Sequence, residues 1–333
     1  MICDTDLFTN LQVVVLLNMP RYRDDFETSR ILSDYIKSIE QDEDSMHKMR
    51  LDAVVIMPIY ELIFSIYANN EDLEGMQDIL VRAKKASSCF HRKEAYAIYY
   101  NMLSEYYDIL LDGFYDTDNQ DEERILNKML DAIEKTLFYS KQNISYDINH
   151  LYVKNILAKA TILMRSNRGT VRKIDKLITN AKKIIIENTT EYADVRLQYY
   201  LVCAWYYALV QDDKNMAEVF IKDALELSNV IIPTDLQRIE DVIIPCANIY
   251  FELYCYNQAM TLLYKGTRLC FKHINTDSYA FIRQQLYNHF FQVGIEAQQV
   301  EWCQKMIKLI ETENKEILDN KNRVIIPEEV RSL

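Results

Sequence analysis

A helical pattern occurs twice near the middle of the chain, over 200–224 and again over 243–266. In each copy a large residue, a small residue and an aromatic residue are followed by a small-large-small triplet; the first copy has Tyr200, Ala204, Tyr207, Ala217, Ile221 and Ala224. Residues three or four positions apart share one face of a helix, so two helices packed through small residues explain the pattern. A repeat of this length predicts a stack of helix pairs.

Weaker copies of the pattern extend in both directions. The first position of the triplet is assigned to Met76, Ile125, Ile174, Ala217, Ala259 and Trp302. These positions recur at intervals of about 42–49 residues, which predicts roughly seven helical hairpins. The first of them is expected to comprise helices over 4–18 and 24–40. The organisation predicted from these intervals is an N-terminal capping hairpin over 1–44, helical repeats over 45–319 and a linker or tail over 320–333.

Composition agrees with an all-α fold. The 333 residues include only 5 glycines and 5 prolines, too few for the many tight turns of a β-rich chain. Hydrophobic residues make up 49% of the chain, which is enough to form a large core. In an array of repeats such a core grows lengthwise, because each unit packs only on its neighbours.

Charge and cysteine usage limit the partners and the compartment. A formal charge of −12 disfavours nucleic acid, since phosphate contact needs a basic face. The 7 cysteines are an odd number without metal-site spacing, as expected of small core residues in a reducing cytoplasm. The apolar run over 11–17 is too short to cross a bilayer. We therefore expect a cytoplasmic protein without membrane insertion; the oligomeric state is not indicated.

The two central copies resemble the tetratricopeptide repeat, whose unit is a pair of antiparallel helices with this arrangement of large, small and aromatic residues. The resemblance implies an all-α, right-handed superhelical array. The units here are longer than the family's usual 34 residues, and the proline that often ends a unit occurs once, as Pro233. Elongated arrays of this kind are similar to the sensor halves of bacterial regulatory proteins.

The resemblance also implies a binding surface, because the first helices of such repeats line a concave groove. Carried onto this chain, the groove residues are Glu61, Asn101, Glu105, Asp108, Arg165, Leu201, Trp205, Asn248 and Glu252. Acidic, amide and aromatic side chains suit an extended peptide or protein segment. The function expected from the resemblance is non-enzymatic binding of such a segment, as the sensory or regulatory part of a signalling protein. The alternative is a free-standing scaffold for protein assembly.

No motif predicts catalysis, a metal or a cofactor. The segment from Asp116 resembles the start of a calcium loop but has Asp121 where glycine is needed and Asn127 where glutamate is needed. A basic run over 165–183, which includes Arg172 and Lys176, is either a docking patch for an acidic partner or a solvated outer face.

Overall fold

A computed structural model describes residues 26–40, 53–70, 72–113, 119–141, 146–187, 192–272, 277–316, 323 and 325–326. Within these ranges the chain is helical, contains no strand, and has no helix that is both long and apolar enough to span a bilayer. The all-α fold class is therefore confirmed for the described residues. The first helix predicted over 4–18 lies outside them. The right-handed superhelix and the number of seven hairpins stay predictions.

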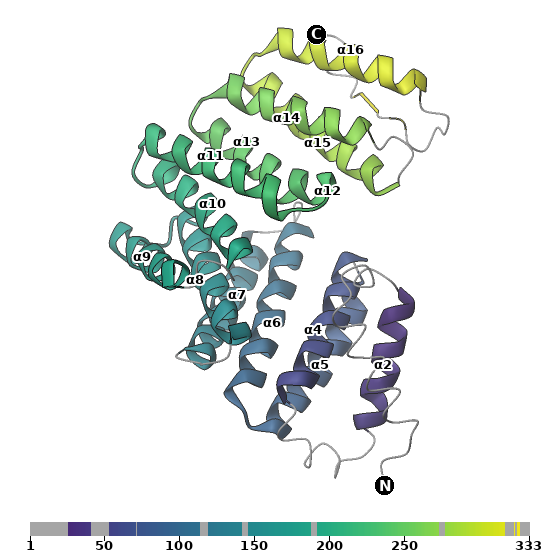
Figure 1. The fold of residues 1–333 in the computed structure, drawn as a ribbon, viewed down its shortest axis with the longest axis vertical. Helices are drawn as coiled ribbons and strands as arrows, with labels where there is room; N and C mark the ends of the chain where they lie inside the picture. Colours follow the sequence, from purple (N-terminus) through teal and green to yellow (C-terminus); the bar gives the residue numbers. More distant parts are fainter. Residues whose placement is uncertain are drawn as a thin grey trace. The chain divides into compact units, whose positions relative to one another are not determined.

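The chain falls into two compact units, 1–159 and 160–333. The boundary between these units differs from the boundaries predicted from the sequence, which lie at 44 and 319. Unit 1 consists of α2 (Phe26–Glu40), α4 (Ala53–Asn69), α5 (Leu73–Phe90), α6 (Lys93–Gly113), α7 (Asn119–Ser140) and most of α8 (Tyr146–Arg165). Successive helices pack on each other, α4 on α5 and α6 on α7 (Figure 1). This is the neighbour-to-neighbour packing expected of helical pairs.

Unit 2 continues the same order of helices. It contains the end of α8, then α9 (Val171–Glu187), α10 (Ala193–Leu209), α11 (Lys214–Ile231), α12 (Asp235–Arg238), the π-helix η3 (Ile239–Ile243), α13 (Ile244–Glu252), α14 (Tyr256–Phe271), α15 (Asp277–Glu296) and α16 (Val300–Glu316). Pairs α10–α11, α13–α14 and α15–α16 are each in contact (Figure 1).

Small residues sit where the helices of unit 2 approach most closely. Ala204, Ala217 and Ala259 are 0% exposed and Ala247 is 1% exposed, and Ala204, Ala247 and Ala259 belong to one apolar core cluster. Gly294 of α15 is equally restricted, since a Cβ there would lie 2.5 Å from the sulfur of Cys303. Close packing therefore depends on these positions remaining small.

One backbone hydrogen bond recurs at the start of the second helices and fixes the register of the repeats. The N–H groups of Met76, Ala217, Ala259 and Cys303 each donate to the carbonyl four residues earlier, over 3.0, 3.0, 3.1 and 3.1 Å. The first three are the predicted positions. The assignment of Trp302 is wrong by one residue, because Cys303 makes this bond and is buried whereas Trp302 is only partly buried.

The links within the helix pairs α8–α9, α10–α11, α13–α14 and α15–α16 each contain one residue in the left-handed backbone conformation. Asn167, Asp212, Tyr254 and Gln298 are left-handed, with φ of 52°, 51°, 56° and 54°. Asparagine and aspartate adopt this conformation readily, whereas tyrosine and glutamine do so at a cost. The links are thus equivalent in structure although their sequences differ.

A proline explains the π-helical turn between α12 and α13. Pro245 has no N–H, and its ring disfavours an ordinary α-turn before it. The chain instead widens over Ile239–Ile243, and the N–H of Ile244 bonds the carbonyl of Ile239. The structure therefore shows a local change of helix type just before this proline.

The C-terminal segment, predicted to be a linker, contacts unit 2 at the residues that the structure describes. Ile326 is buried in the core cluster. The backbone N–H of Ile325 donates to Oε1 of Gln284 over 3.1 Å, and Nε2 of Gln284 donates to the carbonyl of Ile325 over 3.2 Å. These bonds hold the segment against α15.

Candidate binding surfaces

Four polar side chains join the first helices α6 and α8 in unit 1; we call this cluster the polar joint. Nδ2 of Asn155 donates to Oδ1 of Asn101 over 2.9 Å, and Nδ2 of Asn101 donates to Oε1 of Glu105 over 3.1 Å. Lys154 forms an ion pair with the same Glu105 oxygen at 3.1 Å. Two of the predicted groove residues therefore lie together and bind each other.

Burial separates the roles of the residues in the polar joint. Asn101 is 2% exposed and both ends of its amide are hydrogen-bonded within the protein, so it is not placed for the direct ligand contact predicted for it. The side chains of Lys154 and Glu105 are 41% and 35% exposed. The Glu105–Lys154 pair is therefore the part of the polar joint that solvent reaches. The buried Asn101 holds Glu105 in position through its hydrogen bond.

The other two predicted residues of unit 1 flank this cluster on the same or a neighbouring first helix. Glu61 of α4 is partly buried, and its carbonyl accepts a hydrogen bond from Ser65 over 3.0 Å. Asp108, one turn beyond Glu105 on α6, is exposed. Both residues have interaction partners within the protein.

In unit 2 the predicted residues Leu201 and Trp205 occupy the partly buried face of α10. Both pack against the core cluster that also contains Ala204, Ile243 of η3 and Ala247 of α13. Helices α10 and α13 are in contact. Trp205 is thus held by packing on one side and reaches solvent on the other.

A polar pair links the next two first helices. Nε2 of His289 on α15 hydrogen-bonds Oδ1 of Asn248 on α13. Burial lowers the pKa of His289 below its usual 6.5, while the nearby Glu296 carboxylate partly opposes this effect. The imidazole is therefore neutral at pH 7. The amide oxygen predicted to meet a ligand is engaged with this ring.

The two remaining predicted residues are exposed. Glu252 lies at the end of α13, and Arg165 at the end of α8. The basic residues of α9 that were considered as an alternative docking patch, Arg172, Lys173, Lys176, Lys182 and Lys183, are exposed as well.

The sequence did not point to Lys154, Asn155 or His289, although each completes a contact with a predicted residue. Their spacing in the sequence could have indicated these contacts, because each residue follows its partner by 41–54 residues, which is about one repeat. Polar residues one repeat apart on successive first helices are candidates for such pairs.

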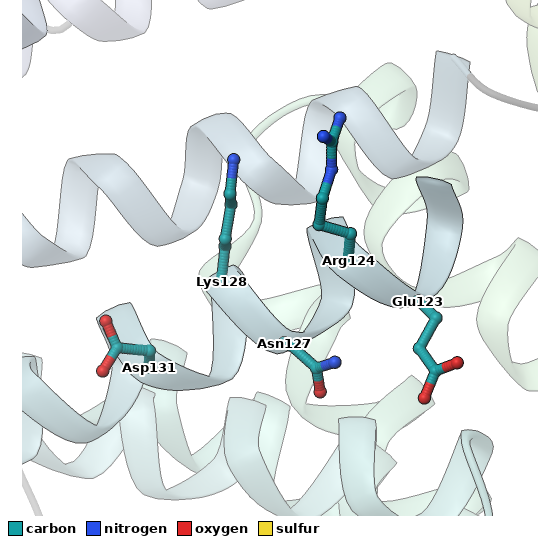
Figure 2. A pocket seen from close by; sticks show the side chains of 5 residues that line it. All are labelled: Glu123, Arg124, Asn127, Lys128 and Asp131. Carbon is teal, nitrogen blue, oxygen red and sulfur yellow. The ribbon is translucent and has the colours of Figure 1, made fainter. Parts of the chain in front are cut away.

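Unit 1 also has a shallow hollow along α7, lined by Glu123, Arg124, Asn127, Lys128 and Asp131 (Figure 2). Arg124 is paired with Asp121 at 3.1 Å, and the ammonium of Lys128 lies 5.8 Å from the centre of the Tyr107 ring. Figure 2 shows Arg124 and Lys128 directed away from Glu123, Asn127 and Asp131. The side chains therefore do not converge on one ligand position.

The described residues contain no group of three or more His, Cys, Asp or Glu side chains arranged to hold a metal ion. No protein-family model matches the chain, and no curated protein is significantly similar to it in sequence.

Proposed function

We propose that the chain is a non-enzymatic module that binds a peptide or protein segment along its first helices, as the sensory or regulatory part of a signalling protein. The observation that carries the proposal is that Trp205 packs against the core cluster and is only partly buried. A tryptophan fixed in this way loses little conformational entropy on binding, and tryptophan is enriched among the residues that dominate interfaces.

The surroundings of Trp205 suit an extended segment. Leu201 stands one helical turn away on α10 and supplies apolar surface. Glu252, exposed at the end of the adjoining helix α13, offers a carboxylate to a basic side chain or a backbone N–H. Unit 1, considered by itself, offers a separate surface on its first helices α6 and α8, where the Glu105–Lys154 pair presents one charge of each sign.

Site-specific photocrosslinking tests this proposal. Glu252→p-benzoylphenylalanine places a crosslinker on the first helix α13, and Lys222→p-benzoylphenylalanine places one on the second helix α11; both positions are exposed. A discrete partner, identified by mass spectrometry, is expected from position 252 and not from position 222. Stronger crosslinking from 222, or none from either, contradicts binding along the first helices.

Exposed apolar side chains on second helices favour a structural scaffold as the second candidate. Phe138 of α7 is 71% exposed and Val230 of α11 is 82% exposed. Such residues promote contacts between copies when they belong to a larger patch. Sedimentation velocity decides this point: concentration-dependent assembly that Phe138→Ser or Val230→Ser abolishes supports the scaffold, and a monomer at all concentrations rejects self-assembly.

A further inference from the structure

A basic hollow lies between the second helices α14 and α16 of unit 2, and none of its lining residues belongs to the first helices of the proposed function. Its volume is about 510 Å³, and its lining consists of Lys265, Arg268, Leu269, Phe271, Lys272 and Glu313. Three cations and one carboxylate at a single hollow are unusual in a chain of net charge −12.

The three cations are exposed and lie at i, i+3 and i+7, so they share one face of α14. Among the described residues none of the three forms an ion pair or a side-chain hydrogen bond. Two exposed lysines elsewhere in the chain are engaged instead: Lys135 pairs with Asp131 at 2.6 Å, and Lys305 lies 4.5 Å from the Trp302 ring centre. The donors of the hollow therefore remain available to a ligand.

A fourth cation lies below the surface. The guanidinium carbon of Arg283 is 5.9 Å from the centre of the Phe271 ring, and Arg283 is 0% exposed. Burial lowers the pKa of Arg283, but arginine starts so high that the group stays charged at pH 7. A charge in a weakly polar interior acts over a longer distance than one in water, so it adds to the positive potential at Phe271.

The spacing of the cations indicates the shape of the ligand. Lys265 and Lys272 are separated by roughly 10 Å along the helix axis, at about 1.5 Å per residue. Alternate side chains of an extended peptide are about 7 Å apart, so two or three carboxylates can reach the three cations together. A single phosphate ion is too small to span them. The partly buried Leu269 provides apolar floor between the charges.

We propose that this hollow binds an acidic, extended peptide segment of a partner protein, with the carboxylates of alternate residues on Lys265, Arg268 and Lys272 and the methylene groups of those side chains lying over Leu269. Glu313, the lining residue from α16, repels carboxylates placed next to it and so limits the register of the peptide.

The test is fluorescence anisotropy with a labelled octapeptide of alternating glutamate and leucine. The full chain is expected to bind it, with affinity that falls as salt rises, and to bind the glutamine-leucine analogue at least tenfold more weakly. K265E/R268E is expected to weaken binding at least tenfold. The matched control R172E/K176E makes the same charge change on α9 and should leave binding within about twofold, and circular dichroism verifies that both variants remain helical.

Three results overturn the proposal. They are no binding of the glutamate peptide at millimolar concentration, equal loss of binding in the two double variants, and tighter binding of an eight-nucleotide thymidine oligomer than of the peptide. The last result would assign the hollow to phosphates. None of these outcomes bears on crosslinking from position 252, so the failure of this proposal and that of first-helix binding are distinguishable.

Discussion

The first helices α6 and α8 of unit 1 are joined by hydrogen bonds, whereas the first helices α10 and α13 of unit 2 are joined by apolar packing. Between α6 and α8, Asn155 binds Asn101, and Glu105 binds Lys154. Between α10 and α13, the shared core cluster contains Ala204 and Ala247 instead. A polar joint fixes register through directional bonds but is costly when one partner is lost. An apolar joint tolerates changes of shape, but not an increase of volume where helices already touch.

The largest effect on stability is expected from overpacking the apolar contact between α10 and α13, which we call the apolar joint. Ala204→Leu or Ala247→Leu adds a branched side chain at positions that are 0% and 1% exposed. Each is expected to lower the free energy of unfolding by about 1–3 kcal/mol, because the paired helices must separate. Urea titration followed by circular dichroism measures this change. Lys222→Leu, on the exposed face of α11, should change it by less than about 0.5 kcal/mol; equal stability of all three variants would refute the register.

Breaking the polar joint is expected to have the next largest effect. Asn155→Ala removes the donor to Oδ1 of Asn101, which is 2% exposed, so a buried oxygen loses its partner. The expected loss is about 1–3 kcal/mol in the free energy of unfolding. The double variant Asn101→Leu/Asn155→Leu, measured in the same titration, should lose less than the sum of the two single leucine variants. Strict additivity would mean that the two amides are not coupled.

Binding measurements test Trp205, the partly exposed residue of α10 that packs beside the apolar joint. Trp205→Ala is expected to weaken binding of the crosslinked partner at least tenfold, or about 1.4 kcal/mol, while leaving the helical signal intact. Isothermal titration calorimetry with that partner provides the measurement. R172E/K176E on α9 is the control and should have much less effect. The opposite ranking would move the binding site to the basic face of α9.

The fold could be predicted because its main determinant is local in the sequence. Small residues at helical spacing mark where helices cross, and Ala204, Ala217, Ala247 and Ala259 are all buried there. The details of the backbone were not predictable in this way. Tyr254 and Gln298 adopt the left-handed conformation that usually indicates asparagine or glycine, so their side chains gave no sign of the turn.

The candidate surface was predicted less well than the fold, because its contacts join residues a whole repeat apart. Sequence spacing placed Asn101 and Asn248 on the first helices but could not show that Asn155 and His289 would occupy their amides. The exposure of a side chain depends on which side chains of the neighbouring helix cover it. The residue pattern within one helix carries no information about that neighbour. The predicted residues Glu252 and Arg165 stand at helix ends and are exposed.

The smallest expected effect is a pH dependence of stability that distinguishes the His289–Asn248 pair of unit 2 from the polar joint of unit 1. His289 can titrate whereas the Asn101–Asn155 pair cannot. Because burial lowers the folded-state pKa of His289 below its unfolded value of 6.5, the unfolded chain binds more protons between the two values. The contribution of His289 to stability is therefore fully present above pH 6.5 and is lost as the pH falls through the folded-state pKa.

His289→Gln keeps a side-chain amide that can donate to Asn248 but removes this titration. Urea titrations at pH 7.5 and at pH 5 are expected to show a smaller loss of stability on acidification for the variant than for the parent, since all other titrating groups are common to both proteins. Asn155→Gln, the matched change in the polar joint, should leave the pH dependence of the parent unaltered. If parent and His289→Gln lost the same stability, the imidazole would not be held neutral by burial, and the two kinds of polar pair would be equivalent.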